Sequence, residues 1–99
     1  MKDLIAGLNK AFENNIRLGI MAALAANTKM DFNALKGLLS VTDGNLASHL
    51  KALEKVEYIS VSKQFIGRKP NTTYSATIAG KKAFRDHIDA LEKIIKSNN

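Results

Sequence analysis

A mainly helical domain with one small β-hairpin is the fold class that three features of this 99-residue sequence predict. Apolar residues recur at helical spacing over most of the chain. Between residues 59 and 76 the pattern changes to the alternation that is typical of strands. Just before that change, within residues 33–56, two short helical segments meet through a connection of three or four residues. Short helices joined in this way indicate a helix-turn-helix unit.

Size and composition favour a single folded domain. A chain of this length has room for one modest core, and its hydrophobic fraction of 45% is normal for a folded protein. The absence of cysteine excludes disulfides, thiolate metal sites and cysteine nucleophiles. No apolar signal segment follows Met1, and the longest apolar run, residues 19–26, is shorter than the roughly 20 residues of a membrane span. We therefore expect a cytoplasmic protein that does not enter the membrane.

The first 27 residues are expected to form the N-terminal helices. Apolar residues keep helical spacing over residues 4–12 and again over residues 16–26. Asn14–Asn15 interrupts this pattern only weakly. The sequence therefore leaves open whether residues 3–26 form one helix or two.

Residues 33–56 are expected to form the helix-turn-helix unit. Asn33 can cap a brief first helix, and Thr42 or Asp43 can cap the second, because such side chains accept a hydrogen bond from a free backbone N–H. The segment before the unit, residues 30–32, is long enough only for an edge strand. The second helix carries an apolar stripe at i, i+4 and i+7, formed by Leu46, Leu50 and Leu53.

The opposite face of the second helix is small, polar and cationic. It consists of Gly44, Ser48, Lys51 and Lys55, flanked by Asn45, Ala47 and Ala52. A narrow face of this kind can enter the major groove of DNA, where long acidic side chains would be repelled by phosphate. The same composition also fits an ordinary surface helix with few acids. The helix alone does not decide between these two interpretations.

Residues 58–76 are expected to form the β-hairpin. The alternating run Ile59–Phe65 predicts a half-buried strand, and the run Thr72–Ala76, rich in β-branched and aromatic residues, predicts its partner. Between them, the expected turn of residues 67–71 displays Arg68 and Lys69, and a proline stiffens it. Two cations at a stiff tip favour contact with phosphate or with the minor groove.

The excess of positive charge is concentrated after the helix-turn-helix unit. The chain has 15 basic and 9 acidic residues, for a net charge of +6. Between Tyr58 and Arg85 there is no acid, and the six cations of this stretch are Lys63, Arg68, Lys69, Lys81, Lys82 and Arg85. A localised basic surface indicates a polyanionic partner. A basic surface that serves only solubility would give the same count.

The last segment, residues 77–96, is expected to be a helix capped by Thr77. Its apolar residues form a seam with a period of about 3.5 residues, which is suited to pairing with another helix. The seam either joins two copies of the chain or packs on the first helix of the same copy. We favour the homodimer, because exposed apolar stripes of this size usually have partners. The expected interface residues are Leu4, Leu8, Phe12, Phe84, Ile88, Leu91 and Ile95.

Several short motifs together carry a family resemblance. They are Thr42–Leu46, Ser48–Leu50 with Leu53, Tyr58–Ile59, Gly67–Pro70, and Tyr74 ahead of Thr77 and Gly80. Over about residues 8–90 the chain resembles the winged helix-turn-helix domain of small prokaryotic transcriptional regulators, relatives of the multiple-antibiotic-resistance and arsenical-resistance repressor families. The resemblance implies helical N- and C-terminal extensions that form a homodimer. It also implies two recognition helices in successive major grooves and two wings on the flanking DNA.

One position departs from the family's pattern. Such domains usually close the recognition helix with glycine, and here that position is Glu57. If the left-handed conformation is needed there, a residue other than glycine costs about 1 kcal/mol. An acid at a helix C-terminus is also unfavourable to the helix dipole. We expect the fold to survive with a frayed or rearranged helix end.

The sequence therefore predicts a double-stranded DNA-binding transcriptional regulator that acts as a homodimer, is not an enzyme and needs no cofactor or metal. The expected DNA-binding residues are Thr42, Asp43, Gly44, Asn45, Ser48, His49, Lys51, Lys55, Lys63, Arg68 and Lys69. His49 can donate to a phosphate or pack at the helix edge, and these alternatives stay open. Two distant histidines without cysteine make a poor metal site.

Two other functions remain alternatives. One is a winged-helix module for protein–protein interaction, whose basic face binds an acidic partner. The other is an architectural protein that binds DNA without sequence preference. Ser48 and His49 diverge by about 100° around the helix, so they cannot act as a nucleophile–base pair. Whether a small-molecule effector exists is not indicated by the sequence.

Overall fold

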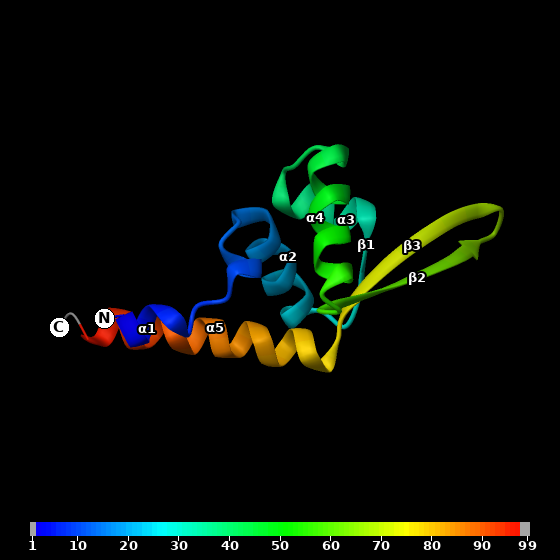
Figure 1. The fold of residues 1–99 in the computed structure, drawn as a ribbon. Coiled ribbons are helices and arrows are strands. Elements are labelled where there is room, and N and C mark those ends of the chain that lie inside the picture. The colour runs from blue at the N-terminus through cyan, green and yellow to red at the C-terminus, as the bar shows by residue number, and fades with distance from the viewer. Residues whose placement is uncertain (1, 98–99) are drawn as a thin grey trace.

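In the computed structural model, which describes residues 2–97, a long C-terminal helix runs along one side of a group of shorter helices, and a β-hairpin projects beyond them (Figure 1). The elements follow one another as α1 (Lys2–Ala6), the 3-10 helix η1 (Lys10–Phe12), α2 (Asn15–Ala26), β1 (Met30–Asp31), α3 (Phe32–Leu39), α4 (Asp43–Lys55), β2 (Ile59–Ile66), β3 (Lys69–Ala76) and α5 (Ile78–Ser97). The predicted fold class, mainly helical with one β-hairpin, is confirmed.

The N-terminal part of the chain forms separate helices. The side-chain oxygen of Asn9 accepts a backbone hydrogen bond at the start of η1. The side-chain oxygen of Asn14 accepts from the backbone N–H groups of Ile16 and Arg17 at 2.9 and 3.1 Å. These are N-cap bonds, which satisfy donors that a helix start leaves free. Asn9 and Asn14 therefore cap separate helices, so residues 3–26 do not form one continuous helix.

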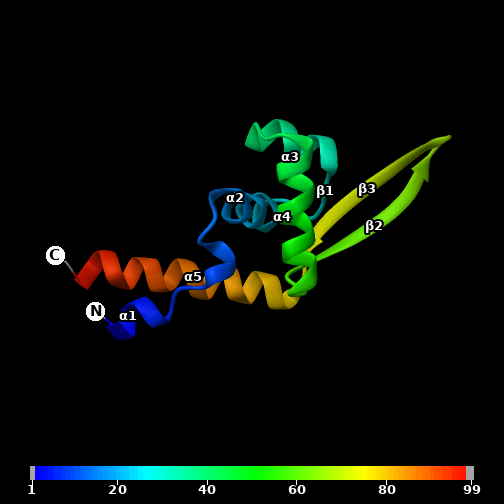
Figure 2. The ribbon, with the colours of Figure 1, turned by 45° about the horizontal axis from the view of Figure 1, so that its top comes forward.

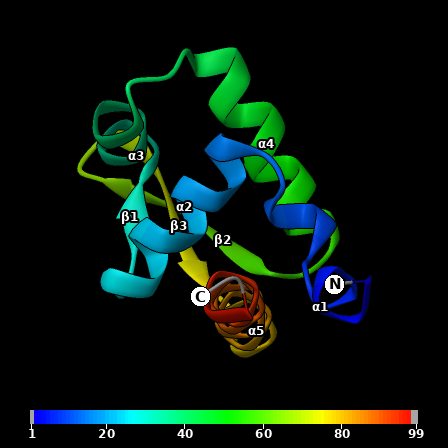
Figure 3. The same cartoon turned by 90° about the vertical axis from the view of Figure 1, so that its left-hand side faces the viewer.

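Helix α2 occupies the centre of the helical body. Viewed along α5, it lies between α5 and the pair formed by α3 and α4 (Figure 3). Its buried residues Ile20, Met21 and Leu24 belong to one hydrophobic cluster with Leu35 of α3. Full burial of an aliphatic side chain of this size contributes about 1.5–3 kcal/mol. The core is thus built around α2, and the other helices pack on it.

Helix α3 begins earlier than the sequence predicts. Asp31 is its N-cap and accepts a hydrogen bond from the backbone N–H of Ala34 at 2.7 Å. The prediction that Asn33 caps this helix is wrong, because the chain passes directly from β1 into the helix and Asp31 holds the extended conformation of a cap. Strand β1 pairs with Thr73 and Tyr74 of β3, which confirms the expected edge strand.

Helix α4 starts at the first of its two candidate caps. Thr42 accepts a hydrogen bond from the backbone N–H of Asn45 at 3.2 Å, and Asp43 is the first helical residue. The predicted leucine stripe is buried: Leu46, Leu50 and Leu53. Because each of these side chains contributes about 1.5–3 kcal/mol on burial, they fix the rotation of α4 and hence which face stays exposed.

The sheet of the described residues has the order β1–β3–β2 and is antiparallel. In the hairpin, Ile66 pairs with Lys69, so the turn has only two residues, Gly67 and Arg68. Gly67 adopts φ +64°, which suits glycine at the first position of a two-residue hairpin turn. The predicted turn of residues 67–71 is therefore too long.

Lys69 and Pro70 belong to strand β3 and not to the turn. Pro70 lies opposite Phe65 of β2. Strand β1 reaches only Thr73 and Tyr74, so within the described residues no third strand pairs with β3 at Pro70. A proline lacks the N–H that a neighbouring strand would need, and it is tolerated at such an uncovered edge.

The C-terminal end of α4 is closed by backbone hydrogen bonds around a left-handed residue. Glu57 has φ +62°, the conformation that its position in the family's pattern predicts. The N–H of Tyr58 donates to the carbonyl of Leu53 at 3.0 Å, and the N–H of Glu57 donates to that of Glu54 at 2.9 Å. This pair of bonds is the Schellman motif. The helix end is therefore ordered, and the expected fraying is not seen.

The start of α5 is attached to this same helix end, and we call the four residues involved, Glu57, Tyr58, Thr77 and Gly80, the Tyr58 joint. The N–H of Thr77 donates to the carbonyl of Tyr58 at 3.0 Å, and its hydroxyl donates to that of Glu57 at 2.7 Å. The hydroxyl oxygen also accepts from the N–H of Gly80 at 2.9 Å, which confirms Thr77 as the predicted cap. A Cβ on Gly80 would lie 2.0 Å from the oxygen of Tyr58. Only glycine fits there.

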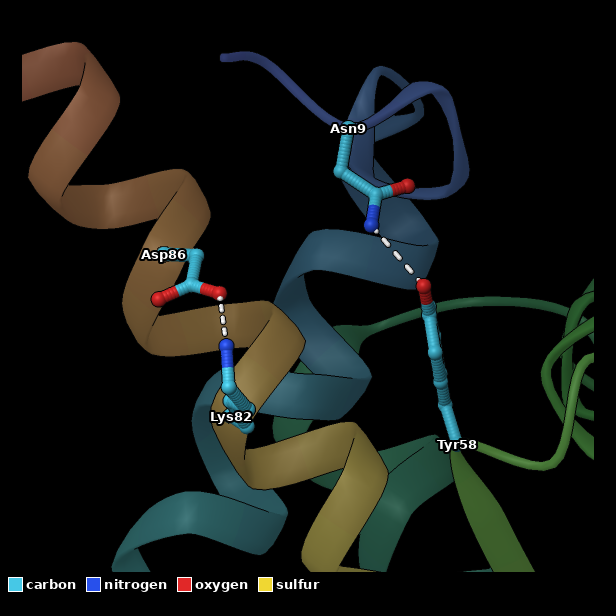
Figure 4. Close-up of polar contacts among 4 residues, drawn as sticks. All are labelled: Asn9, Tyr58, Lys82 and Asp86. Atoms are coloured by element: carbon cyan, nitrogen blue, oxygen red, sulfur yellow. Dashed lines mark hydrogen bonds and ion pairs between the residues drawn. The ribbon is translucent and has the colours of Figure 1, made fainter.

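A second attachment holds the N-terminal segment on α5. The side-chain amide of Asn9 donates to the hydroxyl of Tyr58 at 3.0 Å (Figure 4), and its backbone N–H donates to Nδ1 of His87 at the same distance. Phe12, only 2% exposed, packs with its ring 5.3–5.9 Å from those of Tyr58, Phe84 and His87. Phe12 therefore lies in the core of one copy, which differs from its expected place in a dimer interface.

Helix α5 is amphipathic along its length. Its polar side carries ion pairs one turn apart, between Lys82 and Asp86 at 2.8 Å (Figure 4) and between Glu92 and Lys96 at 2.6 Å. Both pairs are exposed to solvent, and exposed ion pairs contribute little to stability. Within residues 2–97, no helix is both long enough and apolar enough to cross a membrane.

Candidate nucleic-acid interface

The face of α4 opposite the leucine stripe is open to solvent. Its exposed residues are Gly44, Asn45, Ser48, Lys51 and Lys55. Among the residues that the structure describes, neither lysine forms an ion pair. The side chain of Asn45 makes no hydrogen bond within the same residues. The face therefore presents cations and a free amide on a helix whose rotation is fixed by the core.

The first turn of α4 has its own intramolecular contacts. Thr42 serves as the cap, and the carboxylate of Asp43 forms an ion pair with Lys36 of α3 at 2.8 Å. An acid in the first turn is also favourable to the helix dipole. Thr42 and Asp43, both expected to bind DNA, are thus occupied in starting the helix and in joining it to α3.

His49 is bonded to a residue that the sequence did not single out. Nη1 of Arg17 lies 3.1 Å from Nδ1 of His49, and Nε of Arg17 donates to the carbonyl of Ala11 at 2.7 Å. A guanidinium has no acceptor, so Nδ1 of His49 accepts and the imidazole proton is on Nε2. The available signal was that Arg17 is the only charged residue between positions 14 and 28.

The predicted basic stretch divides between two elements. Lys63, Arg68 and Lys69 lie on the hairpin, which projects away from α5 in both side views (Figures 1 and 2). The remaining cations, Lys81, Lys82 and Arg85, lie on α5, where Lys82 is paired with Asp86. Of the three hairpin cations, Lys63 lines a groove together with Lys51 of α4, whereas Arg68 and Lys69 lie at the far end of the hairpin.

The hairpin leaves the helical body soon after it begins. Ile59 is buried and Val61 half-buried, but every residue from Ser62 to Pro70 is exposed. Phe65, which the alternating pattern placed on a half-buried strand, is 74% exposed. The strands are therefore correctly predicted, but the distal half of the hairpin has no layer packed against it among the described residues.

Comparison with known proteins identifies the family. A family model described as a winged helix DNA-binding domain matches residues 16–95. This chain belongs to that family. The resemblance to a winged helix domain inferred from the sequence is confirmed. By their positions in this fold, we call α4 the recognition helix and the β2–β3 hairpin the wing.

Relatives support the same conclusion. The chain is 34% identical over 88 residues to an uncharacterized protein of Methanocaldococcus jannaschii, covering 89% of this chain and 96% of that protein. A structure of a transcriptional regulator homologue from Pyrococcus horikoshii matches with a TM-score of 0.90 and 28% identity, over 100% of this chain and 99% of that one. The YusO protein from Bacillus subtilis shares the fold, with a TM-score of 0.82 at 14% identity, over 98% and 68% of the two chains.

The winged helix fold places the recognition helix beside the root of the wing. A groove of about 240 Å³ lies between them, lined by Lys51 and Glu54 of α4 and by Val61, Lys63 and Tyr74 of the wing, together with Ala47 and Leu50. Burial raises the pKa of the Tyr74 hydroxyl, and the nearby Glu54 carboxylate raises it further. The hydroxyl therefore stays neutral, and Lys51 and Lys63 provide the positive charge of this groove.

The apolar seam of α5 divides into an inner and an outer part. Phe84 packs edge-on against Phe12, 5.9 Å between ring centres, inside the same copy. Further along, Ile88 and Ile95 are exposed, Ile95 by 65%. Helix α1 lies beside the C-terminal half of α5, where Leu4 and Leu8 are half-buried (Figure 2). Of the expected dimer residues, Phe12 and Phe84 thus pack in the core of one copy, whereas the side chains of Ile88 and Ile95 are exposed to solvent.

The two histidines have different surroundings. His87 is buried and accepts a hydrogen bond from the backbone of Asn9, whereas His49 is half-exposed beside Arg17. Within residues 2–97, no three histidine or acidic side chains converge as metal ligands would. Both histidines instead use Nδ1 as an acceptor.

Proposed function

We propose that this winged helix domain is a sequence-specific regulator of transcription that binds double-stranded DNA as a homodimer. The observation that carries the proposal is the exposed face of α4, which is narrow and cationic and is held in place by three buried leucines. The major groove of B-DNA, about 12 Å wide, admits an α-helix. Lys51 and Lys55 then contact phosphate, and the smaller residues between them approach the bases.

Asn45 is the residue best suited to read a base. An asparagine amide can donate to and accept from adenine in the major groove, and the amide of Asn45 is not engaged within the described residues. Ser48, one turn further along the same face, can donate or accept. If Asn45 reads a base, Asn45→Ala should cost about 1–3 kcal/mol on the preferred site and little on random DNA. An equal loss on both, measured by fluorescence anisotropy, would instead make Asn45 a backbone contact.

The wing supports contact with the flanking DNA. Arg68 lies in its two-residue turn, with Lys69 and Lys63 on the strands behind it. An arginine can enter a narrow A·T-rich minor groove, where the negative potential is deepest, whereas lysines meet phosphate as point charges. We therefore place Arg68 in the minor groove and the two lysines on the backbone.

The homodimer is supported by the outer part of the α5 seam. Ile88, Leu91 and Ile95 recur at heptad-like spacing, and two of them are exposed. Because Ile95 makes no contribution to the core of one copy, Ile95→Asp should give a folded monomer. Sedimentation at micromolar concentration measures this, with Lys96→Asp as a control next to the seam. A wild-type chain that sediments as a monomer would disprove the homodimer.

Selection of bound sequences from random duplex DNA tests the proposed function. We expect a palindrome to be enriched, because a two-fold dimer reads two equivalent half-sites. The enrichment should persist at higher salt, which removes non-specific binding first. Binding to all duplexes alike would indicate an architectural protein. Absence of duplex binding would leave a protein–protein interaction module as the remaining candidate.

A further inference from the structure

A recognition helix in the major groove lies between two phosphate backbones, one along each flank. In this protein one flank of α4 faces the wing, where Ala47 and Lys51 line a groove shared with Lys63. His49 is two residues beyond Ala47 and therefore lies about 200° further around the helix, on the opposite flank. The wing lies on one flank only, so any cation that contacts the backbone on the other flank must come from another element.

Arg17 of α2 provides positive charge on that second flank. Its Nη1 lies 3.1 Å from Nδ1 of His49, and its Nε donates to the carbonyl of Ala11 at 2.7 Å. Among residues 2–97, no carboxylate forms an ion pair with Arg17. The side chain is half-buried, and its two contacts hold it in place before any ligand arrives. A guanidinium fixed in this way loses little conformational freedom on binding an anion.

His49 adds a second donor beside this charge. Because Nδ1 accepts from Arg17, the ring proton is on Nε2, and His49 is half-exposed on the recognition helix. The free N–H groups of Arg17 and the Nε2–H of His49 form a pair of donors suited to a phosphate, whose oxygens accept several hydrogen bonds. We infer that Arg17 and His49 together bind one phosphate of the DNA backbone on the flank of α4 away from the wing. This inference rests on the proposed function.

The alternative is that the two residues only tie α2 to α4. Both roles use the same internal hydrogen bonds, but they differ in their dependence on salt. A phosphate contact releases condensed counterions from DNA, and each one contributes about 0.9 to the slope of log K against log salt concentration. An internal tie contributes nothing to that slope.

A salt titration of DNA affinity distinguishes the two roles. The probe is a fluorescent duplex that carries the selected palindrome, titrated with the full chain. Arg17→Gln should flatten the slope by about two units, because each arginine acts twice in a homodimer. Arg85→Gln, which removes an arginine from α5, is the matched control and should leave the slope unchanged. An unchanged slope for Arg17→Gln, even with weaker binding, would overturn the inference.

Substitutions of His49 test the position of its donor. A glutamine amide can place an N–H near the position of Nε2, whereas asparagine reaches only the position of Nδ1. We expect His49→Gln to keep affinity within about threefold and His49→Asn to lose about tenfold. Equal affinity for these two variants would also overturn the inference. If the wild-type chain binds no duplex at all, the proposed function itself fails. If the wild-type chain binds but Arg17→Gln leaves the slope unchanged, only the inference about Arg17 and His49 fails.

Discussion

The Tyr58 joint and the tip of the wing lie at opposite ends of the β2–β3 hairpin and are built in opposite ways. At the joint, backbone carbonyls of Glu57 and Tyr58 accept hydrogen bonds from Thr77, and a glycine lies against the peptide of Tyr58. At the tip, Phe65, Arg68 and their neighbours are exposed, and no other layer of the described chain packs on them. The joint therefore fixes the position of α5 relative to α4 and the hairpin, whereas the tip provides exposed side chains for contact with a partner. Substitutions at the two places should separate stability from binding.

The largest effect is expected at the joint. In Gly80→Ala the new Cβ would lie 2.0 Å from a backbone oxygen, so the start of α5 must move. We expect the free energy of unfolding to fall by about 3 kcal/mol, at the upper end for overpacked sites. Gly37→Ala is the control, because a Cβ there meets nothing within 4 Å and should add up to about 1 kcal/mol. Urea denaturation measures the free energy of unfolding of both variants. If Gly80→Ala were as stable as the wild-type chain, the backbone at the joint could shift to accept a Cβ at little cost.

At the tip the pattern should reverse. Arg68→Ala should change the free energy of unfolding by less than about 0.5 kcal/mol, because the side chain is exposed and unpaired within the described residues. Its DNA affinity should fall, with the salt slope flattened by about two units in a dimer. The loss should be greater on A·T-flanked than on G·C-flanked sites, whereas Lys69→Ala should weaken both alike. A wing outside the interface would leave both variants unchanged in a salt titration.

Gly44 sharpens the comparison, because it lies on the binding face but affects stability. A Cβ there would meet nothing within 4 Å, so packing inside one copy does not require glycine. Alanine in a helix is more favourable than glycine by about 1 kcal/mol. We expect Gly44→Ala to raise the free energy of unfolding by up to that amount and to weaken DNA binding, because the backbone could no longer approach as closely. Tighter binding by the variant would contradict this account.

The smallest effect is expected where the joint itself is strained. Glu57 holds φ +62°, a conformation that glycine adopts without steric cost. Glu57→Gly should raise the free energy of unfolding by about 0.5–1 kcal/mol, since relief of the left-handed strain exceeds the added entropy of the unfolded chain. Thermal unfolding would show the change, and Glu57→Ala, which keeps a Cβ, should not. A loss of stability in the glycine variant would mean that the Glu57 side chain has a role of its own.

Features that depend on neighbouring residues could be predicted from the sequence. The leucine stripe of α4 follows from its spacing, and Thr42 is one of the two cap candidates that local chemistry allows. The left-handed conformation of Glu57 is indicated only by the glycine that the family usually has at this position. The recognition face follows from the stripe, because the rotation of a helix fixes both faces at once. Local patterns were thus sufficient for the element that the proposed function depends on.

Features that depend on distant pairing could not be predicted. The two-residue turn is set by which residues of β2 and β3 pair, and a glycine followed by cations fits several registers. Phe12 keeps helical spacing whether it faces a second copy or its own core, and only the ring contacts with Tyr58 and Phe84 decide this. The bond between Arg17 and His49 joins residues 32 positions apart.

The uncovered edge of β3 has a consequence for solubility. An exposed two-stranded hairpin offers free N–H and carbonyl groups on which another chain could add a strand, the first step of aggregation. Here Pro70 removes one of those N–H groups, and Lys63, Arg68 and Lys69 give every copy of the hairpin the same charge. Proline and lysine at edges are the means by which natural sheets prevent such pairing. The residues that suit the wing to a polyanion are therefore also those that prevent it from pairing with another wing.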